Sequence, residues 1–384
     1  MKLFVPKETT PGETRIPAVP EAVKKLAALG IEVRVEAGIG APIGLSDKEF
    51  ESAGAEIVGD RAAALAEADM VVRLRPPPES ERAALKPGAL HIGYLDPFRD
   101  PSAVQALAAA RTTAICMEMI PRTTLAQKMD ALSSQANLGG YVAVVLAAER
   151  LGKILPMMMT PAGTVAPSKV FVIGAGVAGL QAIATAKRLG ARVEAFDTRP
   201  VVEEQVLSLG ARFVKVDLGE TGQTRDGYAR QLTEEQLARQ QEAMARHCAG
   251  ADVVITTAQV FGRKAPVIVT REMLEQMRPG SVVVDMAAET GGNVEGTVLN
   301  QEVDIGGVTV IGLGNLPGRV PVDASQMYAS NVANLIDHFW DKEAGSFRLD
   351  LEDEILDGCV VAHEGEVRNA ALRELLANKG GEAS

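Results

Sequence analysis

The sequence has few aromatic residues, few cysteines and no excess of positive charge. Aromatic residues make up 4% of the chain, too few for a surface on which bases stack. The formal net charge of −11 argues against nucleic acid as a partner. The three cysteines, Cys116, Cys248 and Cys359, are widely spaced and form no CxxC pair. This pattern indicates a reduced intracellular protein without disulfides or a thiolate metal site.

The sequence also lacks the segments that would direct it to or through a membrane. No apolar run reaches the roughly 18 residues that span a bilayer. The N-terminus, MKLFVPKETTPGETR, brings charge and proline too early for a signal peptide. We therefore expect a soluble chain, and a length of 384 residues suits two domains.

Strand-like and helix-like segments alternate along the chain, which predicts parallel βαβ units. In the first 120 residues the β-rich runs are 3–6, 32–38, 70–75, 89–95 and 113–119. A second series comprises 170–174, 192–197, 212–217, 251–257, 281–287 and 308–313. Six strands with intervening helices fit a doubly wound Rossmann sheet.

Two long helix-like stretches, 126–151 and 324–340, flank the second series and are interpreted as connections between domains. We expect an α/β fold with two Rossmann-like, doubly wound parallel-sheet domains joined by long helices, with a cleft between them. The first domain is expected to comprise residues 1–125 plus 325–384, and the NAD(H)-binding Rossmann domain residues 126–324.

The run VFVIGAGVAGLQA carries the strongest motif. Gly174 permits a tight turn after the strand, Gly176 lets the backbone approach a pyrophosphate, and Gly179 lets helix and strand pack closely. The phosphates would meet free N–H groups at the start of the helix. We add Val177, the residue after Gly176, to this dinucleotide site.

A second strand delivers Asp197 to the same site, in the run AFDTRP. A carboxylate there accepts both ribose hydroxyls and repels a 2′-phosphate, which favours NAD over NADP. Arg199 is close enough to soften that preference. Asp197, Thr198 and Arg199 complete the predicted cofactor-binding set in this part of the chain.

A second glycine-rich run, EAGIGAPIGLSDKEF, also follows a strand. The spacing of Gly38, Gly40 and Gly44 is wrong for a dinucleotide loop, and Pro42 interrupts it. A capping box at Ser46 and Glu49 predicts that the next helix starts only there. We interpret this run as a connecting loop.

No obvious acid or base for dehydrogenase chemistry is present. His91, His247, His338 and His363 are interpreted as structural and lack metal-ligand spacing, and no GxSxG, HExxH or P-loop pattern occurs. A hydride passing directly between two nicotinamide rings needs no proton carrier, because the enzyme need only hold both rings and exclude water.

The run PRTTLAQKMDALSSQANLGGYVAV, residues 121–144, places a polar series ahead of a helix of small and apolar residues. Gln127, Asp130 and Ser134 would share one helical face at this spacing. From the residues alone, a capped helix start with solvated side chains is a better interpretation than a binding site.

Over nearly its whole length the sequence resembles the NAD(H)-binding component, domain I, of proton-translocating NAD(P) transhydrogenase. The matching segments are VPKETTPGETRIP, the loop 122–134, VIGAGVAGLQA, AFDTRP, DGYA, TREMLEQMRPGSVVVDMAAETGGN and LPGR. The resemblance implies that Arg122, Gln127 and Asp130 surround the nicotinamide as catalytic residues, with Ser133 beside the carboxamide. It also implies that Asp197 holds the adenine-side ribose. Relatives often have a second basic residue where this sequence has Leu125.

The resemblance gives a meaning to residues 217–240, DLGETGQTRDGYARQLTEEQLARQ, which otherwise form a glycine-bearing insertion longer than most βα connections. In the family this segment is a mobile flap that closes over bound nucleotide. Tyr228 is then a lid residue of the cofactor site, and Gly222 and Gly227 are hinges.

The sequence also resembles alanine dehydrogenase, which has the same fold. That family has a lysine in the run matching VVRLRP and a histidine in the run matching GYLDP, whereas this sequence has Arg75 and Asp96. The arginine that binds the substrate carboxylate is matched by Arg15. An amino-acid dehydrogenase and an NAD-sensing protein without turnover remain the alternatives.

The leading interpretation is the NAD(H)-binding alpha subunit of a proton-translocating transhydrogenase, with NADP(H) bound on a partner. The resemblance implies a homodimer, an NADP(H)-binding beta subunit, a small membrane alpha-2 subunit, and a peripheral position on the cytoplasmic face of the plasma membrane. Because the sequence ends at Ser384 without membrane helices, the membrane part is expected on separate polypeptides.

Overall fold

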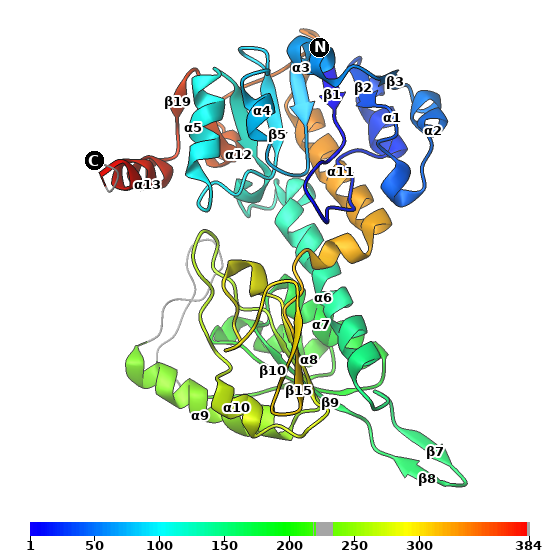
Figure 1. The fold of residues 1–384 in the computed structure, drawn as a ribbon, viewed down its shortest axis with the longest axis vertical. Helices are drawn as coiled ribbons and strands as arrows, with labels where there is room; N and C mark the ends of the chain where they lie inside the picture. Colours follow the sequence, from blue (N-terminus) through cyan, green and yellow to red (C-terminus); the bar gives the residue numbers. More distant parts are fainter. Residues whose placement is uncertain (218, 220–232, 382–384) are drawn as a thin grey trace. The chain divides into compact units, whose positions relative to one another are not determined.

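A computed structural model describes residues 1–217, 219 and 233–381, and it divides the chain into two compact units (Figure 1). Unit 1 consists of Met1–Gln135 and Gly318–Ser384, and unit 2 consists of Ala136–Pro317. Each unit contains one large sheet, which confirms the expected α/β class with two domains. The boundaries expected from the sequence, 125/126 and 324/325, concern domains that fold independently, and they stay a prediction.

The sheet of unit 1 has eight strands in the order β19-β18-β6-β5-β4-β1-β2-β3. The strands are β1 Lys2–Val5, β2 Glu32–Glu36, β3 Glu56–Val58, β4 Met70–Val72, β5 Leu90–Gly93, β6 Thr113–Cys116, β18 Val360–His363 and β19 Glu366–Val367. β1 to β6 are parallel in the doubly wound order 3-2-1-4-5-6. β18 and β19 extend this sheet in antiparallel fashion from the C-terminal stretch.

Helices accompany this sheet along the chain. They are α1 Pro20–Ala28, α2 Asp47–Ser52, α3 Arg61–Glu67, α4 Glu79–Arg82, α5 Pro101–Ala109, α11 Pro321–His338, α12 Glu354–Cys359 and α13 Ala370–Gly381. Short 3-10 turns are η1 Ala41–Ile43, η2 Met117–Met119 and η3 Gln127–Met129, and β16 Trp340–Asp341 pairs with β17 Ser346–Phe347. The apolar face of α11 packs into the core of unit 1 with α1, and its Tyr328 is fully buried.

The glycine-rich run at 36–50 is a connection, as expected. Gly38 and Gly44 adopt positive φ angles of 75° and 76°, and Gly44 ends η1. A Cβ at Gly40 would lie 2.5 Å from the carbonyl oxygen of Leu45, so the turn excludes a side chain there. The predicted capping box of Ser46 with Glu49 is present at the start of α2.

The sheet of unit 2 has seven strands in the order β11-β10-β9-β12-β13-β15-β14. The strands are β9 Lys169–Ile173, β10 Arg192–Phe196, β11 Arg212–Phe213, β12 Val253–Thr256, β13 Val282–Asp285, β14 Glu302–Ile305 and β15 Val308–Ile311. All six expected strands are present and parallel, and β14 adds an antiparallel edge that was not expected. The helices are α7 Val177–Arg188, α8 Glu203–Ser208, α9 Glu234–Gly250 and α10 Arg271–Glu275, with 3-10 turns η4 Pro200–Val202 and η5 Ala288–Thr290. The turn η6 Leu316–Arg319 spans the boundary between the units, which falls after Pro317.

Helix α6, Ala131–Arg150, corresponds to the expected long helix at 126–151, and the boundary between the units falls after its Gln135. Among the described residues it is the one helix with the length and composition to cross a membrane, with a mean hydropathy of 1.2. Half of that apolar stretch is buried in the protein. A core helix passes the same test, so this is weak evidence for a membrane span.

An antiparallel hairpin of β7 Met158–Thr160 and β8 Gly163–Val165 projects from the sheet of unit 2 (Figure 1). Its strands are exposed throughout, and the exposed fractions of Met159 and Val165 are 72% and 48%. The sequence did not predict this hairpin. An exposed apolar ribbon of this kind is typical of a surface that another chain covers.

His91 on β5 is fully buried, and neither ring nitrogen has a hydrogen-bond partner among the described residues. Burial lowers the pKa of His91 from 6.5 to about 3, and the nearby Arg73 charge adds to this effect. The folded state therefore keeps His91 neutral where the unfolded chain takes up a proton. This stability is fully present above pH 6.5 and is lost as the pH falls toward 3.

We predict that His91→Leu removes this pH dependence. Between pH 7.5 and 5 the free energy of unfolding of the wild type should fall relative to the variant by about 2 kcal/mol, because one unit of pKa corresponds to about 1.4 kcal/mol. Urea unfolding at both pH values measures the difference. If the difference in the free energy of unfolding between wild type and variant is the same at pH 7.5 and pH 5, His91 is not buried in its neutral form. As a control, this difference should not change between pH 7.5 and 9.

Candidate functional site

The glycine loop of unit 2 connects β9 to α7 at the point where the strand order reverses, between β10 and β12. Gly174 has a φ of 99°, and its N–H donates to the carbonyl oxygen of Phe196 at 2.8 Å. A Cβ at Gly179 would lie 1.8 Å from the carbonyl oxygen of Gly174, so only glycine fits there. Around Gly176 the nearest atom to such a Cβ is 3.9 Å away, which leaves its backbone open to a ligand.

Helix α7 starts at Val177, and its N-cap residue, Gly176, provides no side-chain hydrogen bond to the first turn. The first N–H groups of this helix of 12 residues therefore lack the side-chain acceptor that a Ser or Asp cap would supply. Val177 is 38% exposed. These features fit the binding of a pyrophosphate at the helix N-terminus.

Helix α6 packs directly against this region of unit 2. A Cβ at Gly140 would lie 2.2 Å from the carbonyl oxygen of Ala178, in the first turn of α7. At the preceding residue, Gly139, a Cβ would lie 3.1 Å from Met286. Gly140 thus marks a close approach of the backbones of α6 and α7, and Gly139 makes room for the Met286 side chain, roles that the sequence alone did not predict.

Asp197 follows β10, and its side chain is 6% exposed. One carboxylate oxygen accepts from the N–H of Ala175 in the glycine loop at 2.7 Å. The guanidinium of Arg199 binds both carboxylate oxygens, with Nε to Oδ1 at 2.9 Å and Nη2 to Oδ2 at 2.7 Å. The structure thus places Asp197, Arg199 and the glycine loop together, with Thr198 half-buried between the two charged residues.

Polar side chains at the ends of the neighbouring strands, half-buried at Thr257 and fully buried at Asp285, support the loop. The hydroxyl of Thr257, after β12, donates to the carbonyl oxygen of Gly174 at 3.1 Å. Asp285, at the end of β13, is fully buried and accepts from the N–H groups of Asn293 and Val294 at 2.9 and 3.1 Å. Asn293 in turn bonds both the N–H and the carbonyl of Ala258. The run DMAAETGGN matched the family in sequence, but no role for its residues was predicted from it.

In unit 1 the candidate nicotinamide loop precedes α6. Asp130 caps that helix, because its carboxylate accepts from the N–H and the hydroxyl of Ser133 at 2.8 and 2.6 Å. Gln127 belongs to the separate 3-10 turn η3 and is exposed, as is Arg122. The prediction that Gln127, Asp130 and Ser134 share one helical face is therefore wrong, because the α-helix begins only at Ala131.

Buried contacts anchor this loop to α11. Met129 is fully buried, and the carbonyl oxygen of Lys128 accepts from the side-chain amides of Asn331 and Asn334, each at 3.0 Å. Ser134 donates to the carbonyl oxygen of the Asn331 amide at 2.7 Å. The loop backbone is thus fixed within unit 1 while Arg122 and Gln127 face outward.

Two of the residues compared with alanine dehydrogenase, Arg15 and Arg75, form a separate charged cluster in unit 1. Arg15 is buried and binds both carboxylate oxygens of Glu13 at 2.7 Å, and its Nη1 donates to Gln135 at 2.8 Å. Arg75 binds the same glutamate at 2.7 Å. Burial alone would raise the pKa of Glu13, but Arg15 and Arg75 outweigh it and hold this pKa at about 2. The side chain of Asp96 is 58% exposed.

Other sequence features have structural roles or lie outside the described residues. The three cysteines are buried and unpaired, and the described residues contain no cluster of three or more His, Cys, Asp or Glu side chains that could hold a metal. His247 bonds Glu194 at 2.7 Å, and His363 bonds Thr113 at 2.9 Å. Tyr228, Gly222 and Gly227 lie outside the described residues.

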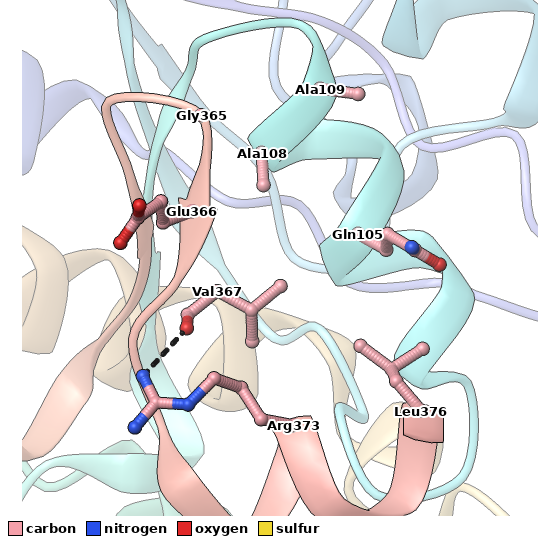
Figure 2. Close-up of a pocket in the computed structure, with 8 residues that line it drawn as sticks. All are labelled: Gln105, Ala108, Ala109, Gly365, Glu366, Val367, Arg373 and Leu376. Carbon is pink, nitrogen blue, oxygen red and sulfur yellow. Dashed lines mark hydrogen bonds between the residues drawn. The ribbon is translucent and has the colours of Figure 1, made fainter. Parts of the chain in front are cut away.

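A shallow pocket of about 620 Å³ lies elsewhere in unit 1, beside α5, β19 and α13 (Figure 2). Arg373 points toward the carbonyl oxygen of Val367 and donates to it at 3.1 Å, while Gln105 lies on the opposite wall. None of the candidate site residues lines this pocket. The lining offers one carboxylate, from Glu366, and one guanidinium, from Arg373, which is bound to a backbone carbonyl. This combination does not indicate a particular reaction or ligand.

Comparisons with known proteins match the two parts of the chain to two domains of one family. Residues 4–139 match the family model "Alanine dehydrogenase/PNT, N-terminal domain", and residues 143–370 match "Alanine dehydrogenase/PNT, C-terminal domain". An NAD(P) transhydrogenase subunit alpha protein of Rhodospirillum rubrum is 44% identical, over 97% of this chain and 99% of that protein. The solved transhydrogenase structure from Sinorhizobium meliloti is also 44% identical, with a TM-score of 0.86 over 96% of this chain and 100% of that one.

Similarity to alanine dehydrogenase is lower. The Bacillus subtilis enzyme is 30% identical over 87% of this chain and 86% of its own length. The glycine loop, the sheet order and both domain matches point the same way: the chain belongs to the alanine dehydrogenase/PNT family and is more similar to the alpha subunit of NAD(P) transhydrogenase than to alanine dehydrogenase.

Proposed function

We propose that the chain is the NAD(H)-binding component of a proton-translocating transhydrogenase, which binds NADH and lets hydride pass directly to NADP⁺ on a partner subunit. The observation that carries this proposal is an intact dinucleotide loop in a chain whose matching cations are paired with Glu13 and whose matching position for the proton-carrying histidine is an aspartate. Both Arg15 and Arg75 are bound to Glu13, and an exposed Asp96 replaces the histidine.

The nucleotide half of the proposal rests on unit 2. Gly174, Gly176, Val177 and Gly179 would hold the pyrophosphate, because the loop has room at Gly176 and the first turn of α7 lacks a side-chain cap. The Asp197 carboxylate would accept the hydroxyls of the adenine-side ribose and repel a 2′-phosphate. These features support NAD(H) as the dinucleotide of this chain.

The nicotinamide half of the proposal rests on the loop of unit 1. We assign Arg122, Gln127 and Asp130 to the catalytic contacts with the ring and Ser133 to its carboxamide. Reduced nicotinamide supplies the hydride when bound, and the loop residues orient the ring. Because Asp130 and Ser133 hold each other by two hydrogen bonds, this part of the loop keeps its geometry.

The exposed hairpin β7–β8 supports a homodimer. Its strands leave Met158, Met159 and Val165 exposed in the free chain, and a second copy would cover them. The remaining partners in this proposal are the NADP(H)-binding beta subunit and a small membrane alpha-2 subunit. These would hold the chain peripherally on the cytoplasmic face of the membrane and couple hydride transfer to proton movement.

The decisive experiment mixes the purified chain, NADH and an NADP⁺-loaded beta-subunit domain, and follows hydride transfer by absorbance. Transfer that requires both proteins supports the proposal. If hydride never crosses between the nucleotides, the proposal fails. Turnover of NAD⁺ with alanine in the absence of a partner would instead support the alanine dehydrogenase-like activity.

We predict that Gln127→Asn slows hydride transfer at least tenfold while changing the affinity for NADH much less, since a small displacement of the ring costs rate steeply. Single-turnover stopped flow and calorimetry separate the two effects. The same substitution at the exposed Gln105, which lines the pocket in Figure 2, is the matched control. Equal losses in rate and affinity would mean that Gln127 only binds.

We predict that Asp197→Asn weakens NADH binding by at most about 1.5–3 kcal/mol, the scale of hydrogen bonds to a charged group. Calorimetry measures the change. The control is Asp304→Asn, which removes a charge from an exposed strand position of the same unit. Unchanged affinity in the Asp197 variant would remove this residue from the site.

We predict that Met159→Glu raises the dissociation constant of the homodimer at least tenfold, because burying a methionine side chain contributes about 1.5–3 kcal/mol and a charge there opposes association. Sedimentation velocity over a concentration series measures it. Met327→Glu, at a methionine of α11 that is 41% exposed, serves as control. A variant that sediments like the wild type would exclude the hairpin from the interface.

A further inference from the structure

The carboxylate of Asp197 accepts four hydrogen bonds in the structure. Backbone N–H groups of Ala175 and Arg199 provide two of them, at 2.7 and 2.9 Å. The side chain of Arg199 provides the other two, at 2.9 and 2.7 Å. An ionised carboxylate offers about four lone-pair sites, so these bonds use its accepting capacity.

The two side-chain bonds have the geometry that a ribose diol would need. The guanidinium presents two parallel N–H donors, one to each carboxylate oxygen, just as the 2′- and 3′-hydroxyls of ribose would present two O–H donors. The two backbone bonds come from the glycine loop and from Arg199 itself, and they do not depend on the arginine side chain. The side-chain fork is therefore the part that a ligand can replace.

We propose that Arg199 is an internal competitor of the ribose diol, so that NAD(H) binds Asp197 only after the arginine side chain has left it. This inference rests on the proposed function, in which Asp197 holds the ribose. Arg199 is then a specificity-determining residue of the nucleotide site. For nucleotides that carry a free diol, the apparent dissociation constant is the intrinsic one divided by the fraction of time for which Arg199 is away from the carboxylate.

The position of Arg199 fits this role. Its side chain is mostly buried but reaches the surface, with 16% of it exposed, so it has a path from the carboxylate to solvent. Its Nη2 also lies 3.9 Å from the position of a Cβ on Gly176, beside the open approach to the loop backbone. The hydrogen bond to Asp197 raises the pKa of Arg199, so the competitor stays charged at any physiological pH.

The test is calorimetric titration of Arg199→Met, which removes the guanidinium and keeps a long apolar side chain. NADH should bind roughly three- to tenfold more tightly, which corresponds to a wild-type site that is open about 10–30% of the time. The control Arg212→Met removes an equal charge from the neighbouring strand, where the arginine is 74% exposed and bonds Glu194. Equal or weaker binding of NADH by Arg199→Met than by Arg212→Met would overturn the competition.

Two probes separate competition for the diol from other effects of the arginine. ADP carries both hydroxyls and 2′,3′-dideoxy-ADP carries neither, and both have the same phosphates. The Arg199→Met variant should bind ADP more tightly than the wild type does and leave 2′,3′-dideoxy-ADP unchanged. Equal tightening of both probes, or weakening of both as expected for an arginine that binds phosphate, would contradict the proposal.

A double-mutant cycle gives a second readout that does not depend on one variant. In the wild type, Asp197→Asn removes both the ribose acceptor and the anchor of the competitor, so the two effects partly cancel. In the Arg199→Met background nothing offsets the loss, and Asp197→Asn should cost three- to tenfold more affinity for NADH than in the wild type. Equal costs in both backgrounds would refute competition.

The outcomes also distinguish this inference from the proposed function. If the wild type does not bind NADH at all, the proposed function fails. If the wild type binds NADH and transfers hydride while Arg199→Met binds no more tightly, only the competition fails. Should Arg199→Met not fold, Arg199→Lys keeps the charge but loses the two-pronged fork, and the same tightening is expected in smaller degree.

Discussion

The carboxylate of Asp197 determines the geometry of the nucleotide region of unit 2. Asp197 directly follows β10, and its carboxylate accepts from the N–H of Ala175, so the residue after β10 holds the turn that follows β9. The turn and the start of α7 pack so closely that a Cβ at Gly179 would overlap the carbonyl oxygen of Gly174. One acidic side chain and one backbone contact thereby position the start of α7, where a helix N-terminus offers N–H groups to an anion.

Unit 1 achieves comparable rigidity with charges and amides. Arg15 donates to Gln135 in the second turn of α6, and Gln135 donates to the carbonyl oxygen of Ala324 in α11. Glu13 is fully buried between two arginines, and this pairing stabilises a carboxylate that burial alone would neutralise. The cations that could bind a substrate carboxylate in a related enzyme are here committed to the protein itself, and this favours positioning over amino-acid chemistry.

Periodicity and glycine spacing predicted the two sheets because their central strands are buried on both faces and read as continuous apolar runs. The edges were harder to predict. The run EVDIGGVTV carries a two-glycine turn between β-rich segments, a hairpin signal that would have given β14. The hairpin β7–β8 has no buried face and hence no alternation to detect. The pair of hydrogen bonds from the Arg199 side chain to Asp197 depends on side-chain torsions. A spacing of two residues in the sequence does not determine these torsions, so the pair could not be predicted.

In the candidate site, the exposed groups are those proposed to contact the nucleotide, and the buried groups hold the backbone around them. Arg122 and Gln127 are exposed, whereas Met129 in the same loop is fully buried, and the side-chain amide of Asn331 donates to the carbonyl oxygen of Lys128. Likewise, Gly176 is open while Thr257 and Asp285 support its surroundings from neighbouring strands. Hydride transfer between two rings demands accurate placement and no proton carrier. A site made of buried anchors and few exposed polar groups fits that demand, and the proposed function assigns no catalytic role to the four histidines.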